Sequence, residues 1–249
     1  MTSATLTLVI VLIGAVYLRG WRHRRSIAGW RAGSFILGLL ATWVATASPV
    51  SSWDGHMLTA HMIQHVLLMT IAPPLFWLGE PLIAAHSARW PLPKGHVRLL
   101  GHPAFCWLAA AAALVVWHVP AIFRLGMYSS TWHFIEHTSF LTTGLLFWWP
   151  VIQPWPSVAR WPRWSMLLYL FLATLPCDVL SGLLVFCDRV AYPMYLCTPQ
   201  NTGFSPLEDQ QCAAALMWTS VTVVFLVAGT ILSMQMLSPK PRLQKAVSI

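Results

Sequence analysis

The sequence contains few charged residues: only 9% of its 249 residues are Asp, Glu, Lys or Arg, whereas 57% are hydrophobic. This shortage excludes an ordinary soluble domain, in which about 25% of the residues are charged. The sequence also lacks a C-x-x-C-H motif, so any bound haem would be noncovalent. It has no polar linker and no low-complexity tract, and we therefore expect residues 1–249 to form a single integral membrane domain.

The hydrophobic residues are concentrated in seven stretches, each long enough to cross a bilayer as a helix of about 20 residues. The sequence therefore predicts an all-α, polytopic membrane protein that forms a bundle of seven transmembrane helices. No positively charged region precedes the first stretch, so we expect a retained helix and not a cleaved signal. The expected helices are 3–18, 33–50, 57–79, 103–122, 131–152, 164–187 and 211–237.

The formal net charge of +8 arises from basic residues that are dispersed over the connections between the apolar stretches. This dispersal is not typical of a nucleic-acid-binding surface, so we expect membrane lipid and no nucleic acid as a partner. If the amino terminus is outside, 13 of the 15 Lys and Arg residues lie inside, and only Arg124 and Arg189 lie outside. The positive-inside rule then predicts a carboxyl terminus on the inner side of a bacterial cytoplasmic membrane.

Two histidine pairs lie within the apolar stretches, in "HMIQH" at residues 61–65 and "HFIEH" at residues 133–137. Residues four apart share one face of a helix, so each pair can direct two imidazoles at one point. With the predicted orientation, both pairs lie in the outer half of the membrane, and His118 reaches a similar depth. The five candidate metal ligands are therefore His61, His65, His118, His133 and His137.

An isolated histidine in a membrane helix commonly serves only as polar glue between helices. Five histidines at one depth are harder to explain in this way, and crowding in a low dielectric favours the neutral imidazole that binds metals. Imidazole suits copper, zinc and iron, whereas neighbouring thioether and thiol groups favour monovalent copper. Further residues at this level could support the metal ligands. Glu136 or Asp178 could orient a ligand through a hydrogen bond, and soft donors could come from Met57, Met62 and Met69.

Four blocks of this sequence resemble the CtaG family of cytochrome c oxidase assembly factors. They are "HMIQHVLLMTIAPPLFWLGEP" at 61–81, "WHVP" at 117–120, "HFIEHTSFLTTGLLFWWPVIQP" at 133–154 and "SPLEDQQCAAALMW" at 205–218. The resemblance implies a seven-helix membrane protein that helps to form the copper-containing part of haem-copper oxidases. It also implies that the partners are oxidase subunits or an extracytoplasmic copper chaperone, and that the protein is not an enzyme.

Three other functions are compatible with parts of the sequence. "HFIEH" fits the H-x-x-E-H motif of inverted zinc proteases, with Glu136 as the general base. Histidines on facing helices could instead hold a noncovalent bis-histidine haem. Pro73 and Pro74 could break a helix as in a transporter, although a kink that the bundle tolerates is the simpler interpretation.

Cysteines are not part of the family pattern, but three of them fall in or beside the last outer connection. They would face an oxidising space, so the sequence allows one disulfide among Cys187, Cys197 and Cys212. The preferred pair is Cys197 with Cys212, because both flank a loop whose ends must return to the bundle.

Overall fold

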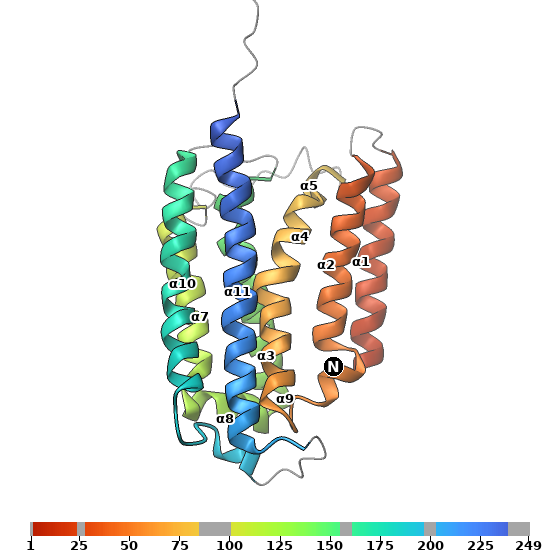
Figure 1. Ribbon diagram of the computed structural model, residues 1–249. Helices are drawn as coiled ribbons and strands as arrows, with labels where there is room; N and C mark the ends of the chain where they lie inside the picture. The colour runs from red at the N-terminus through yellow and green to blue at the C-terminus, as the bar shows by residue number, and fades with distance from the viewer. Residues whose placement is uncertain (1, 24–27, 85–100, 155–160, 197–202, 239–249) are drawn as a thin grey trace, which may run out of the picture.

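Figure 1 shows the computed structural model of the chain, which describes residues 2–23, 28–84, 101–154, 161–196 and 203–238. Over these ranges the protein is all helical and contains no strand. The longer helices are α1 (Ser3–His23), α2 (Gly29–Thr46), α7 (Pro103–His118), α9 (Ser130–Ile152), α10 (Arg163–Val185) and α11 (Pro206–Leu237). The shorter elements are η1 (Pro49–Ser52), α3 (Leu58–Val66), η2 (Leu67–Ile71), α4 (Ala72–Leu78), α5 (Pro81–Ala84), α8 (Pro120–Tyr128) and η3 (Pro193–Leu196).

The long helices lie side by side in a bundle, and the chain runs alternately up and down through it (Figure 1). α11 packs between α10 and α3, and α9 packs against α7 and α4. α1 joins the bundle through α2, which packs on α4. α1 begins near the end of the bundle where α3 and α8 lie, and α11 finishes at the opposite end.

Several of these helices are long and apolar enough to cross a membrane. Among the described residues there are five such spans, or six if the bent pair of α7 and α8 counts as one. α9 corresponds to the expected helix 131–152 but is absent from this set, because its Thr, Ser, His and Glu side chains lower its mean hydropathy. The protein is thus an all-helical membrane protein, and the expected count of seven spans depends on α9.

The expected helix 103–122 is interrupted, which corrects the sequence-based boundary. α7 ends at His118, α8 begins at Pro120, and the two helices are bent by 78°. Val119 between them is extended, because a residue before proline is disfavoured in the helical conformation. α8 consequently lies across one end of the bundle, close to α3 and α9 (Figure 1).

The third span continues past Pro73 and Pro74 and does not break there. The span runs from α3 into α4 through the π-helical turn η2, which absorbs the two missing backbone donors of the prolines. Gly144 of α9 packs directly on this turn, since a Cβ at this position would lie 2.7 Å from the Met69 carbonyl oxygen. The absence of a side chain therefore allows α9 to approach α3 and α4 closely.

A capping box explains why α11 begins at Pro206, five residues before the expected start. The Ser205 side chain accepts from the Glu208 N–H, and the Glu208 carboxylate accepts from the Ser205 N–H. The expected disulfide between Cys197 and Cys212 falls outside the described residues, because Cys197 does. Cys187 and Cys212 are both free.

Candidate metal centre

α3 places two imidazoles in the interior of the bundle. His61 and His65 lie one turn apart, their ring centroids are 4.2 Å apart, and they are 0% and 4% exposed. The start of α3 has no side-chain cap of its own. Instead, Asp209 of α11 accepts hydrogen bonds from the Leu58 N–H at 2.6 Å and the Thr59 hydroxyl at 2.6 Å. A carboxylate from another helix therefore fixes the turn that precedes His61.

α9 places a buried carboxylate against both of these imidazoles. Glu136 is 0% exposed, and its Oε1 lies 3.4 Å from His61 Nε2 and 3.3 Å from His65 Nε2. Gly126 of α8 covers the other side, where a Cβ would lie 2.7 Å from Glu136 Oε2. We call His61, His65 and Glu136 the inner triad; their ligand atoms all lie within 4.8 Å of one another.

A second carboxylate approaches from the segment before α3. Asp54 Oδ2 lies 3.3 Å from His133 Nε2, and the rings of His133 and His61 are 5.9 Å apart. We call Asp54, His61 and His133 the outer triad; their ligand atoms also lie within 4.8 Å of one another. His61 belongs to both triads.

His118 adds a nitrogen and sulfur pair beside the inner triad. Its Nδ1 donates to the Leu114 carbonyl at 2.7 Å, so in the neutral ring the lone pair is on Nε2. That lone pair faces Met62 Sδ at 3.4 Å, which brings two acceptors together. The His118 ring lies 5.7 Å from that of His65.

Many polar atoms in this cluster are buried without an aligned hydrogen bond, although Glu136 Oε1 lies within 3.4 Å of both imidazoles of α3. They include both ring nitrogens of His61 and His65, Nε2 of His137 and both carboxylate oxygens of Glu136. Buried polar groups are normally paired, because leaving one unpaired costs about 1–3 kcal/mol. Imidazole lone pairs and a carboxylate aimed at one point are suitable donors for a metal ion. The residues present therefore fit a metal.

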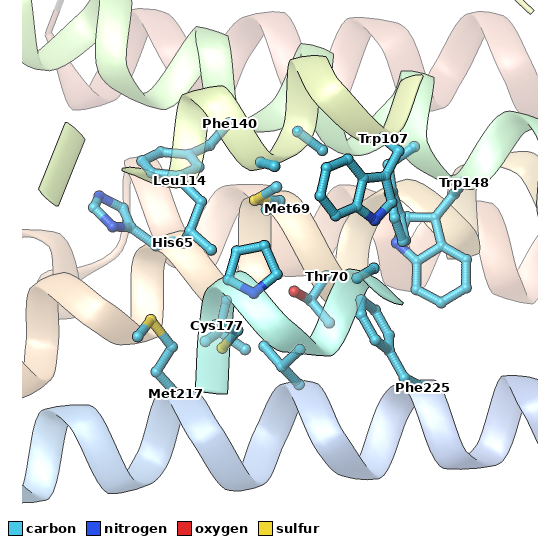
Figure 2. Close-up of a pocket in the computed structure, with 17 residues that line it drawn as sticks. His65, Met69, Thr70, Trp107, Leu114, Phe140, Trp148, Cys177, Met217 and Phe225 are labelled. Carbon is cyan, nitrogen blue, oxygen red and sulfur yellow. The ribbon is translucent and has the colours of Figure 1, made fainter. Parts of the chain in front are cut away.

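The structure brings together the five predicted histidines and Glu136, but not all of the auxiliary residues. The His137 ring lies 6.3 Å from that of His65 and 4.2 Å from that of His133. Met62 contacts His118, whereas Met69 lines a cavity of about 60 Å³ beside His65 together with Cys177 and Met217 (Figure 2). Half-buried Asp178 and Met57 belong to neither triad.

Two aspartates at the site were not predicted from the sequence. Asp54 lies outside the predicted helices and outside the family blocks, and Asp209 is part of a family block without a predicted role. The sequence feature that could have identified Asp54 is its position only a few residues before the first histidine pair, at the same membrane surface. Asp209 lies far from that pair in the sequence, and no local pattern links the two.

Two tyrosines in the connection between α10 and α11 hold the edge of the site. The Tyr195 hydroxyl donates to the Asp54 carbonyl at 2.9 Å, and the Tyr192 hydroxyl donates to the His118 carbonyl at 3.0 Å. Burial raises the pKa of both phenols, and the neighbouring acids raise it further. Both hydroxyls therefore stay protonated and remain donors at neutral pH.

Comparison with known proteins finds relatives in mycobacteria. The chain is 23% identical over 240 residues to an uncharacterized protein of Mycobacterium leprae, which corresponds to 87% of this chain and 36% of the relative. Uncharacterized proteins of Mycobacterium bovis and Mycobacterium tuberculosis are each 24% identical over 247 residues, or 90% of this chain and 37% of theirs. The chain thus spans little more than a third of the length of these relatives. No solved structure matches.

The family comparison is more specific than these pairwise matches. The family model of the cytochrome c oxidase caa3 assembly factors matches residues 15–239, a range that includes every residue of both triads. The match confirms the resemblance that the four sequence blocks indicated. The chain therefore belongs to the family of cytochrome c oxidase caa3 assembly factors.

Proposed function

We propose that this protein binds copper as cargo in its histidine cluster and supplies it during assembly of a haem-copper oxidase. The observation that carries the proposal is the inner triad, in which buried nitrogen and oxygen atoms from two helices face one another without aligned hydrogen bonds. A shared metal ion would satisfy several of these lone pairs at once. His133, His137 and His118 surround the triad and supply further imidazoles.

Two observations favour copper over zinc. Imidazole and carboxylate ligands suit both metals, but a thioether selects for monovalent copper. His118 Nε2 and Met62 Sδ lie 3.4 Å apart, a separation at which both atoms can bind one ion. The family match points to the assembly of cytochrome c oxidase, and the resemblance implies formation of the copper-containing part of such oxidases.

We further propose seven membrane crossings, with the amino terminus outside and the carboxyl terminus inside the cytoplasmic membrane of a bacterium. The alternation of the long helices in Figure 1 supports this topology, with α9 as the crossing that its polar side chains conceal. The excess of basic residues in the inner connections supports the orientation. Both triads then lie in the outer half of the bundle, on the side from which an extracytoplasmic copper chaperone or an oxidase subunit would approach.

The alternative functions receive less support from the geometry. In an inverted zinc protease, Glu136 would serve as base beside a zinc held by His133 and His137, yet it faces His61 and His65 on another helix. A bis-histidine haem needs a cavity between two histidines. The cavity beside His65 measures about 60 Å³, and the groove of about 900 Å³ between α7 and α10 reaches only His118. A role without catalysis accords best with these contacts.

Metal analysis of the purified protein tests the proposal. We expect the full chain in detergent to retain copper after incubation and desalting, and a His61→Ala/His65→Ala variant to lose most of it. The variant should still insert into the membrane, because removal of buried histidines lowers the insertion cost. His56→Ala is the matched control, since His56 is exposed at the same end of α3. Equal copper contents in the double variant and the wild type would refute the proposal.

A further inference from the structure

The inner and outer triads have the same donor set. Each consists of one carboxylate and two imidazoles, and His61 is common to both. Two ligand atoms bound to one ion lie at most about 4 Å apart, since each bond measures about 2 Å. The atoms of each triad lie within 4.8 Å, so each could close on an ion with a shift of less than about 1 Å.

The two triads differ in their access to the surroundings. The side chains of Asp54 and His133 are 14% and 26% exposed, whereas those of His61, His65 and Glu136 are between 0% and 4% exposed. Phe123 of α8 packs on the His61 ring at 4.8 Å, and Gly126 covers Glu136. The inner triad is thus closed on the side of α8, and the accessible side chains are Asp54 and His133 of the outer triad.

Asp54 is held in a position suitable for binding an ion. Its Oδ1 accepts from the Gly55 N–H at 2.6 Å, and its backbone carbonyl accepts from the Tyr195 hydroxyl. These bonds leave Oδ2 directed at His133. A carboxylate oriented in this way loses little conformational freedom when it binds a metal.

We propose that the outer triad is a second metal position, at which Cu²⁺ binds first, and that the ion then moves to the inner triad while His61 remains bound. This inference rests on the proposed function. In the transfer, Asp54 and His133 are exchanged for Glu136 and His65, so one carboxylate and one imidazole replace groups of the same kind. The oxidation state of the ion and the charge of its ligand set are unchanged, and no electron donor is needed.

The shared histidine has a physical advantage in a membrane. A divalent ion without ligands is extremely unfavourable in a low-dielectric interior. Because His61 contributes to both positions, the ion keeps at least one protein ligand throughout the transfer. The same route run backwards would release copper to a partner at the outer surface.

Loading kinetics of the detergent-purified full chain test this inference. We expect Asp54→Asn, which preserves side-chain size, to slow Cu²⁺ binding about tenfold, as measured by stopped-flow quenching of tryptophan fluorescence. The final copper content should be unchanged, because the inner triad is intact. Asp188→Asn is the control, since Asp188 is an exposed aspartate in the connection that follows α10. An Asp54→Asn variant that loads as fast as the control would overturn the inference.

Equilibrium binding provides a second and independent test. His65→Ala/Glu136→Gln removes the inner triad, and we expect this variant to bind one Cu²⁺ with an electron paramagnetic resonance signal that shows nitrogen ligands. Adding Asp54→Asn to it should abolish that signal. If the double variant binds no copper while the wild type does, the outer position is refuted and the proposed function stands. If the wild type binds none, both fail.

Discussion

At the scale of single residues, the Glu136 carboxylate determines which histidines form the inner triad. Glu136 belongs to a sequence motif with His133 and His137, yet its Oε1 contacts His61 and His65 on α3. Asp54, which lies in the segment before α3, contacts His133 instead. The acid that contacts His61 and His65 and the acid that contacts His133 therefore each come from a different segment than the histidine.

The close contact between Gly126 and Glu136 predicts the effect of adding one methyl group at position 126. Gly126→Ala would place a Cβ 2.7 Å from Glu136 Oε2, so the carboxylate must move. We expect copper affinity to fall about tenfold while the helical content is retained, because the end of a glutamate side chain can shift without moving the helices. A competition titration with a copper chelator would measure the affinity.

Gly33→Ala on α2 is the control for this prediction, since no atom lies within 4 Å of a Cβ at Gly33. Alanine is favoured over glycine inside a helix, so this variant should be at least as stable as the wild type. A copper affinity for Gly126→Ala equal to that of Gly33→Ala would show that the carboxylate is not held by α8.

At the scale of the elements, contacts of α3 and α9 with neighbouring helices assemble the site. α11 caps the start of α3 through Asp209, and α9 approaches the π turn of the third span through Gly144. α8 turns by 78° from α7 and covers the cluster through Phe123 and Gly126. These contacts determine which faces of α3 and α9 are turned toward each other.

The cap on α3 predicts a coupled loss of stability and copper binding. Asp209→Ala removes the acceptors of the Leu58 N–H and the Thr59 hydroxyl, so we expect a destabilisation of about 2–3 kcal/mol and a disordered first turn before His61. Thermal unfolding in detergent and copper content would be measured on the same sample.

Ser205→Ala separates this effect from general loss of a helix cap. It removes the capping box at the exposed start of α11, which should cost about 1 kcal/mol and leave copper binding unchanged. If Asp209→Ala is no less stable than Ser205→Ala and binds as much copper, the assigned role of Asp209 is wrong.

At the scale of the whole molecule, topology connects the site to its proposed partners. A reporter enzyme that is active only outside the cytoplasm should be inactive when fused after the last residue, and active when fused after Asp188. The physical reason is the excess of Lys and Arg in the inner connections, which resist translocation. Activity at the carboxyl terminus would reverse the orientation and place both triads on the cytoplasmic side.

The sequence by itself determined the membrane class, most helix positions and the pairing of histidines within a helix. These properties depend on composition and on a periodicity of about 3.6 residues per turn, which are local. The same periodicity gave His61 and His65 one common face, and the four sequence blocks together were enough to identify the family. The break at Pro120 was also readable in principle, because the restriction before proline is local.

Only the tertiary structure decided which acid meets which histidine. His61 and Glu136 come from separate helices, and their contact depends on the rotation of α9 against α3, which Gly144 permits by its lack of a side chain. In a bilayer, the hydrophobic effect contributes little to the choice between helix faces, because lipid is as apolar as the packed side chains. That choice is made by close packing and by nonlocal hydrogen bonds such as those of Asp209, which no pattern along the chain reveals.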